Sequence, residues 1–120
     1  MNLARRDLAV LALLVIGASL AGQWWSARAR STLGDEVAAL ARPGDIRMIS
    51  SETCAICALA RRWFQQHRVA FAECFIERDA QCRADFDAAR APGTPLIVVR
   101  GVPQLGFRPE RLRDALASGT

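Results

Sequence analysis

The sequence contains no lysine and only one histidine, although it is rich in basic residues. All 16 residues counted as lysine or arginine are arginines. The absence of lysine excludes chemistry that depends on this side chain, such as phosphate binding by a Walker lysine or Schiff-base formation. The lone histidine, His67, follows a stretch with helical spacing, and we interpret it as a helix-end residue rather than a catalytic base.

The distribution of the arginines does not indicate a nucleic-acid-binding surface. The formal net charge is +4, and residues 1–30 supply +3 of it through Arg5, Arg6, Arg28 and Arg30 against Asp7. No arginine-rich stripe interleaved with aromatic residues follows in the remaining 90 residues. The basic residues instead flank an apolar segment, as they do around membrane spans and export signals. Nucleic acid is therefore not a predicted partner.

The apolar segment covers residues 8–25 and contains no charged residue. At about 1.5 Å per helical residue, these 18 positions reach about 27 Å, close to the apolar thickness of a bilayer. Trp24 and Trp25 lie where an interfacial aromatic belt is expected. We predict a single-pass anchor or signal at residues 1–27, with the amino terminus inside and the rest of the chain on the outer side. A cytoplasmic-facing module, or cleavage near the small residues Ser19 and Ala21, are the alternatives.

A connector at residues 28–44, ended by Pro43-Gly44, then leads to one small module at residues 45–120. Apolar periodicity and turn residues predict the element order βαβαββα, with Asp79 as a helix N-cap and Pro109 in the first turn of the last helix. This order implies a four-stranded mixed sheet with helices on both faces. We expect strands at 46–50, 69–76, 95–99 and 104–107, helices at 57–68, 77–91 and 109–117, and a bulge at Pro103.

Cys54 and Cys57 stand three positions apart where a strand-like run becomes helical. The N–H groups and the dipole at a helix N-terminus favour a thiolate, so Cys54 is the expected attacking thiol. Cys57, one turn further, is placed to resolve a mixed disulfide. Two other interpretations remain open. The four cysteines at 54, 57, 74 and 82 can bind zinc, although a second two-residue gap is missing. A purely structural Cys54–Cys57 disulfide closes too small a loop to stabilise the fold much.

Cys74 and Cys82 form the second pair, at the end of a predicted strand and the start of a predicted helix. A disulfide between them stabilises the fold by roughly 2–3 kcal/mol in the loop-entropy picture. Two free thiols are the alternative.

Several motifs of the module together resemble the glutaredoxin branch of the thioredoxin-like proteins: "CAIC" after a strand, "GTP" before the strand "PLIVV", and then "LGFRPERL". The last stretch is similar to NrdH-type redoxins, which have a glutaredoxin-like fold and do not depend on glutathione. The resemblance implies that Pro95 is cis and that the backbone of Thr94 meets the substrate beside the attacking cysteine. It also implies substrate-binding roles for Gly106, Phe107 and Arg108, and no cofactor.

The chain departs from the glutaredoxin pattern at its redox centre and at its glycine pair. The usual Cys-Pro-Tyr-Cys is Cys-Ala-Ile-Cys here, and Phe107 replaces the second glycine, which disfavours glutathione as the substrate. The sequence thus predicts a membrane-anchored thiol–disulfide oxidoreductase that uses Cys54 and Cys57. Its expected partners are protein or small-molecule disulfides and dithiols, with an unidentified upstream reductant or oxidant. The alternative is a non-enzymatic thioredoxin-fold accessory or metal-binding module.

Overall fold

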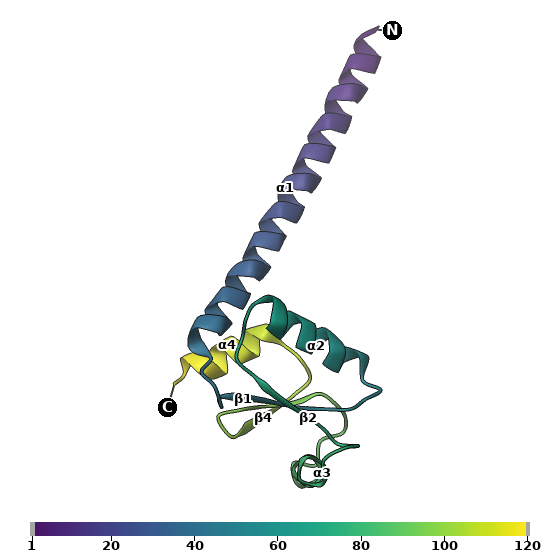
Figure 1. Cartoon of the computed structure of the whole chain (residues 1–120). Coiled ribbons are helices and arrows are strands. Elements are labelled where there is room, and N and C mark those ends of the chain that lie inside the picture. Colours follow the sequence, from purple (N-terminus) through teal and green to yellow (C-terminus); the bar gives the residue numbers. More distant parts are fainter. Residues whose placement is uncertain (1, 120) are drawn as a thin grey trace. The chain divides into compact units, whose positions relative to one another are not determined.

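The computed structural model describes residues 2–119, which form two compact units divided between Thr32 and Leu33. One continuous helix, α1, begins in the first unit and ends in the second. Figure 1 labels the elements, and their bounds are α1 Asn2–Leu40, β1 Ile46–Ser50, α2 Ala55–Gln66, β2 Ala72–Phe75, α3 Ala80–Ala88, β3 Leu96–Val99, β4 Val102–Leu105 and α4 Pro109–Ala117.

The first unit consists of the apolar part of α1. Within the described residues, α1 is the one helix that is both long enough and apolar enough to cross a membrane. Signal sequences share this property. Its large apolar side chains are exposed, among them Leu13, Leu14 and Trp25. A helix that is apolar on all sides is expected in a membrane span or a signal segment rather than on the surface of a soluble domain.

The second unit contains a four-stranded mixed sheet in the order β2-β1-β3-β4. Strands β1 and β2 are parallel and are joined by α2, whereas β1 and β3, and β3 and β4, are antiparallel. After α1, the order of elements is the predicted βαβαββα, so the predicted α/β class and mixed sheet are confirmed.

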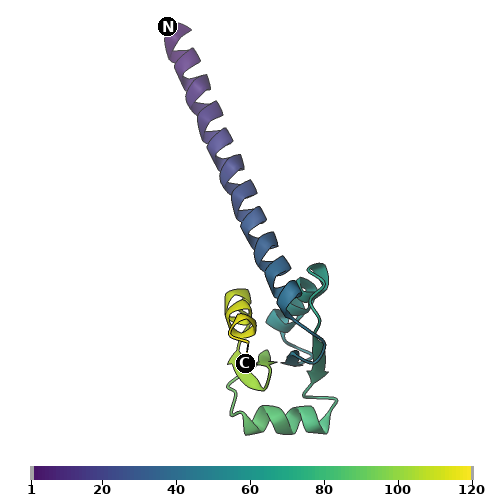
Figure 2. The ribbon, with the colours of Figure 1, turned by 90° about the vertical axis from the view of Figure 1, so that its left-hand side faces the viewer.

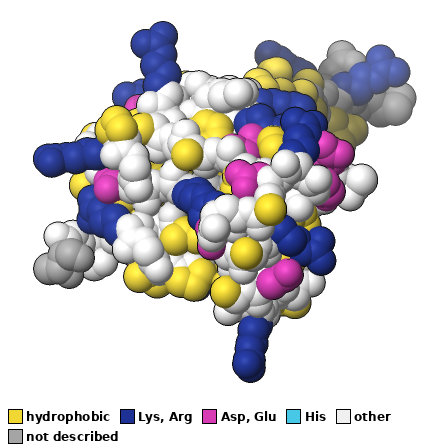
Figure 3. Space-filling model, turned by 60° about the horizontal axis from the view of Figure 1, so that its bottom comes forward, with side chains coloured by type: hydrophobic (Ala, Val, Ile, Leu, Met, Phe, Trp, Pro, Cys, Tyr) yellow, Lys and Arg dark blue, Asp and Glu magenta, His cyan; other side chains and the backbone are white. Residues whose placement is uncertain are grey.

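Helices cover both faces of this sheet, because alternate strand residues point to opposite sides. On one face Met48 and Ile97 pack with Phe64 of α2 and Leu112 of α4 in the main core. On the other face Ile49 packs with Cys82 of α3 in a second core. Figures 1 and 2 show α3 on the side of the sheet away from α2 and α4. Figure 3, which brings the α3 side forward, shows arginine and acidic side chains interspersed on this face rather than separated into patches of one sign.

The last two turns of α1 belong to the core of the second unit. Val37 is 0% exposed and lies in the main core, and Ala38, Leu40 and Ala41 pack against this core. Gly34 lies so close to His67 that a Cβ at this glycine would stand 2.1 Å from His67 Nδ1. The compact unit therefore includes part of the stretch predicted to be a connector.

The hairpin at the end of the sheet differs from its prediction. Arg100 and Gly101 both have positive φ, 48° and 85°, which makes a tight two-residue turn. The following strand therefore begins at Val102 rather than at 104. The expected bulge at Pro103 is wrong, since the pairing runs without interruption from Leu96–Leu105 to Val99–Val102. Pro103 is tolerated because β4 is an edge strand.

Candidate redox site

The cysteines of the CxxC motif lie at the start of α2, as the sequence predicted. Cys54 is the N-cap of the helix, in an extended conformation, and Cys57 lies in its first turn. The two sulfurs form a disulfide, and the N–H of Cys57 donates a hydrogen bond to Cys54 Sγ at 3.0 Å. Cys57 is completely buried, whereas Cys54 is partly exposed. A sulfur in this N-cap position receives the unpaired N–H groups that favour a thiolate.

The register of the sheet brings the other predicted site segments to the same end of the sheet. Ile49, near the end of β1, pairs with Leu96 at the start of β3, and Leu96 pairs with Leu105 at the end of β4. The segments around Cys54, Pro95 and Gly106 therefore lie at the same end of the strands. Pro95 is buried, its bond to Thr94 is cis, and its carbonyl accepts a hydrogen bond from the N–H of Gly106 at 2.9 Å.

Phe107 and Arg108 differ in how they can meet a substrate. The Phe107 ring is partly buried against α2, with centroids 5.5 Å from Trp63 and 5.6 Å from Phe64. Its packing fixes the segment after β4 against the helix that carries the cysteines. Arg108 is exposed at the N-cap of α4 and has no ion pair within the described residues. Arg108 is thus a cation available to an approaching acidic group.

A partly buried ion pair between β2 and α2 lies one helical turn from Cys57. Both carboxylate oxygens of Glu73 accept from Arg61, at 2.6 and 2.8 Å, and Oε2 also accepts from the buried Ser50 hydroxyl at 2.7 Å. Burial raises the pKa of Glu73, but its hydrogen bonds to Arg61 and Ser50 outweigh that effect and lower it. Sequence reasoning missed this group, although an acidic residue within an otherwise apolar strand was the available signal.

A second polar group holds the residues before Cys54. Glu77 accepts from the Ser51 hydroxyl and, at 3.2 Å, from the backbone N–H of Glu52. Arg78 donates to the Glu52 carboxylate. The Ser51 hydrogen bond lowers the pKa of Glu77, so this carboxylate is ionised at neutral pH. The short sequence "SET" before the CxxC motif contained no signal for these contacts, because their partners lie about 25 residues away.

The second cysteine pair lies on the opposite face of the sheet from α2. Cys74 of β2 and Cys82 of α3 form a disulfide, with their Cα atoms 6.1 Å apart. Arg47 donates to Cys74 Sγ at 3.4 Å and to Asp85 at 2.6 Å. Asp79 caps α3, as predicted, and accepts from the N–H of Cys82. Among the described residues, no group of three or more histidine, cysteine, aspartate or glutamate side chains is arranged to hold a metal ion.

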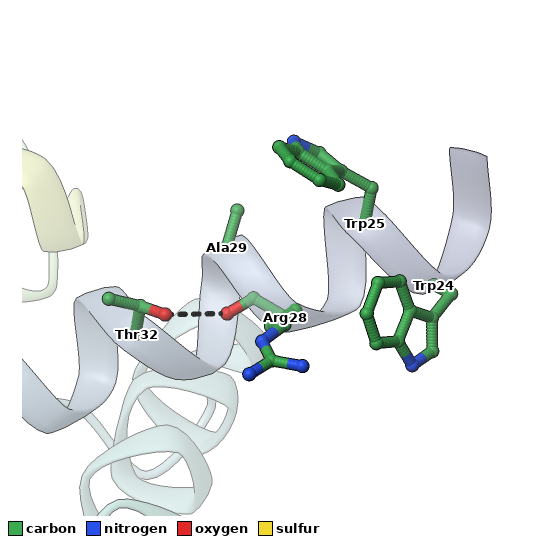
Figure 4. Close-up of a pocket in the computed structure, with 5 residues that line it drawn as sticks. All are labelled: Trp24, Trp25, Arg28, Ala29 and Thr32. Carbon is green, nitrogen blue, oxygen red and sulfur yellow. Dashed lines mark hydrogen bonds between the residues drawn. The ribbon is translucent and has the colours of Figure 1, made fainter. Parts of the chain in front are cut away.

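The aromatic end of the apolar helix carries a shallow pocket within the first unit. Its lining residues are Trp24, Trp25, Arg28, Ala29 and Thr32. Figure 4 shows the Arg28 side chain directed toward the Trp24 ring, and its guanidinium carbon lies 5.2 Å from the ring centroid. Thr32 donates to the Arg28 carbonyl at 2.9 Å. Paired aromatic and basic residues of this kind are typical of a membrane–water interface.

Comparisons with known proteins identify the fold of the second unit. No family model matches the sequence, and the search of curated proteins found no match. Solved structures are similar, among them a point mutant of the thioredoxin-like protein BC3987, with 24% identity over 62% of this chain and 96% of that chain, and a TM-score of 0.55. A glutaredoxin from Methanosarcina mazei Go1 has 18% identity over 61% of this chain and 78% of that one, with a TM-score of 0.51. Wheat glutaredoxin has 14% identity over 73% of this chain and 92% of that one, with a TM-score of 0.50.

These similarities define the class. The chain has a thioredoxin fold of the glutaredoxin-like form, preceded by a long apolar helix, and the predicted fold is confirmed.

Proposed function

We propose that this chain is a thiol–disulfide oxidoreductase whose reactive dithiol is Cys54 and Cys57. The observation that carries the proposal is the unequal placement of the two sulfurs. Cys54 is partly exposed at the N-cap of α2, and Cys57 is buried one turn inside the helix and within bonding distance. The thioredoxin-like and glutaredoxin folds among the similar structures support the same chemistry.

In the reducing direction, the Cys54 thiolate attacks one sulfur of a substrate disulfide. A bond forms between Cys54 Sγ and that sulfur, and the other substrate sulfur leaves as a thiolate. Cys57 then loses its proton and attacks Cys54 Sγ, which breaks the mixed disulfide and releases the second substrate thiolate. The substrate gains two electrons, and two protons complete its thiols. A separate dithiol must reduce the Cys54–Cys57 disulfide before the next turnover, and the reverse sequence oxidises a substrate dithiol.

Protein disulfides fit the surroundings of Cys54 better than glutathione does. Glutathione carries two carboxylates, yet Arg61 and Arg78 near the site are already paired with carboxylates of the chain, and Arg108 can meet only one of the two. The exposed side chains of α2 beside Cys54 are apolar, with Ile56 54% and Leu59 60% exposed. Such a surface suits a polypeptide that presents an apolar residue next to its disulfide.

In the proposed complex, Thr94 and Pro95 flank the substrate backbone beside Cys54. Gly106 allows that backbone a close approach, because it has no side chain and is only partly buried. Phe107 shapes this side of the groove through its packing on α2, and Arg108 binds an acidic group of the substrate.

We further propose that α1 anchors the protein in a membrane, with the module on the outer side. The length of the apolar part of α1, the arginine pairs on both sides of that part and the aromatic residues Trp24 and Trp25 support an anchor. The Cys74–Cys82 disulfide supports the outer side, since structural disulfides persist in oxidising compartments. A cytoplasmic-facing module and a secreted module released by cleavage remain the competing arrangements.

The test of the reaction compares two variants of the full chain with a disulfide-containing protein substrate. Cys54→Ser should abolish both turnover and mixed-disulfide formation, because no attacking thiolate remains. Cys57→Ser should accumulate the mixed disulfide, because the resolving thiol is missing. Equal, mild effects of the two substitutions would contradict the assigned roles and favour a binding or structural pair.

A further inference from the structure

The segment between β2 and α3 holds the residues that lead into Cys54. Glu77 accepts a hydrogen bond from the Ser51 hydroxyl at one carboxylate oxygen and from the Glu52 N–H, at 3.2 Å, at the other. Arg78, its neighbour, donates to the Glu52 side chain. The stretch between β1 and α2 is therefore tied to a segment about 25 residues later in the chain.

The segment that carries Glu77 is itself fixed at both ends. Before it, the N–H of Ile76 donates to the Ser50 carbonyl at 3.0 Å and continues the pairing of β1 with β2. After it, the Asp79 carboxylate caps α3. The Cys74–Cys82 disulfide joins the strand before the segment to the helix after it, and Cys82 is 0% exposed in the second core.

We propose that Glu77 is a positioning residue for Cys54, and that the Cys74–Cys82 disulfide keeps Glu77 in place. This inference rests on the proposed redox function. The N–H of Cys54 donates to the Ser51 carbonyl at 3.2 Å. A change in the orientation of Ser51 therefore changes the position of the Cys54 backbone directly. The N-cap geometry of Cys54 lets its sulfur receive the Cys57 N–H, and that hydrogen bond stabilises the thiolate.

The contact depends on the charge of Glu77 and not only on its shape. An ionised carboxylate offers two acceptor oxygens, and here both face donors. The amide of a glutamine has nearly the same size but only one acceptor oxygen. In Glu77→Gln the amide oxygen can accept from the Glu52 N–H while the NH₂ group donates to the Ser51 hydroxyl, so two charge-assisted hydrogen bonds become weaker neutral ones.

The experiment uses the full chain in detergent with the substitution Cys57→Ser, in which Cys54 is the single free thiol while Cys74 and Cys82 stay bridged. The rate of alkylation of Cys54 by iodoacetamide is measured from pH 5 to pH 9. Loss of this charge assistance corresponds to a change of about fivefold. Glu77→Gln should slow alkylation at pH 7 by about that factor and move the midpoint of the pH profile upward.

Glu110→Gln is the matched control. Glu110 is exposed in the first turn of α4, at the same end of the sheet, and its side chain makes no hydrogen bond or ion pair within the described residues. The substitution Glu110→Gln removes an equal charge without changing the segment between β2 and α3. The alkylation rate of Cys54 and the midpoint of its pH profile should therefore stay unchanged. Equal effects of the two substitutions, an unmoved midpoint in Glu77→Gln, or no effect of Glu77→Gln would each overturn the proposal.

A second comparison tests the role of the disulfide. The double substitution Cys74→Ala with Cys82→Ala should slow Cys54 as Glu77→Gln does. Adding Glu77→Gln to it should cause little further loss, because both act through one segment. If the two losses multiply, the proposed link between the disulfide and Glu77 is refuted. If the double variant does not fold, the result for Glu77→Gln alone decides whether Glu77 positions Cys54. A parent Cys54 no more reactive than an unfolded thiol would instead refute the proposed redox function.

Discussion

The substitution Val37→Ala tests whether the end of α1 is part of the thioredoxin-like unit. Val37 is 0% exposed and packs in the main core with residues of β1, β3, α2 and α4. The change removes two methyl groups, worth about 1.6 kcal/mol of burial at ~0.8 kcal/mol each, and leaves a small cavity. We expect a loss of about 2–3 kcal/mol in the free energy of unfolding. In a unit of this size, that loss lowers the melting temperature by roughly 10–20 °C.

The assay is urea unfolding of a fragment that begins at Leu33, the start of the second compact unit. Trp63 is the single tryptophan of that fragment and packs against Phe107, so its fluorescence reports the core. The matched control is Val102→Ala, the same chemical change at a side chain that is 61% exposed, which should cost well under 1 kcal/mol. Equal losses for the two substitutions, or a fragment from Asp45 as stable as one from Leu33, would refute the reasoning.

Two further predictions concern acid stability and topology. Because its hydrogen bonds to Arg61 and Ser50 hold the pKa of Glu73 below the ordinary value, this carboxylate stabilises the fold above the unfolded pKa. That stability should be lost as the pH falls through the folded pKa. Glu73→Gln should lower the free energy of unfolding by about 2 kcal/mol at pH 7 and reduce its dependence on pH in this range. An unchanged pH dependence would contradict the assignment. A reporter fused after residue 120 that is active only in the cytoplasm should be silent, and full activity would contradict the proposed orientation.

Local patterns predicted most of the fold. The first strand, Ile46–Ser50, and the last helix, which starts at Pro109, have the predicted bounds or start because apolar spacing and cap residues act within a few positions. The contribution of Val37 to the core could not be predicted in this way. The stretch "GDEVAALA" supports two helical turns, but nothing in it identifies the distant strands and helices on which it packs.

In the candidate site too, the local features could be predicted and the long-range contacts could not. The spacing of Cys54 and Cys57 at a strand-to-helix junction is a local feature of the sequence. It was enough to predict that both cysteines lie at the start of α2. The contacts of Glu77 with Ser51 and Glu52 depend on two loops that meet only when β1 and β2 pair. Single charged residues in loops have many possible partners, so the sequence alone does not select among them.

The most direct test of the central claim is whether Cys54 and Cys57 form a reversible two-electron couple. The full chain is equilibrated in buffers of graded dithiothreitol ratio, alkylated, digested with trypsin and analysed by mass spectrometry. The reactive pair falls in the peptide 48–61, while Cys74 and Cys82 fall in the separate peptides 69–78 and 79–83. We predict that the peptide 48–61 gains two alkyl groups in one step that fits a two-electron transition, before the other pair is reduced. Stepwise or irreversible labelling of this peptide, or stoichiometric zinc bound by its thiols, would contradict the redox account and favour a metal-binding module.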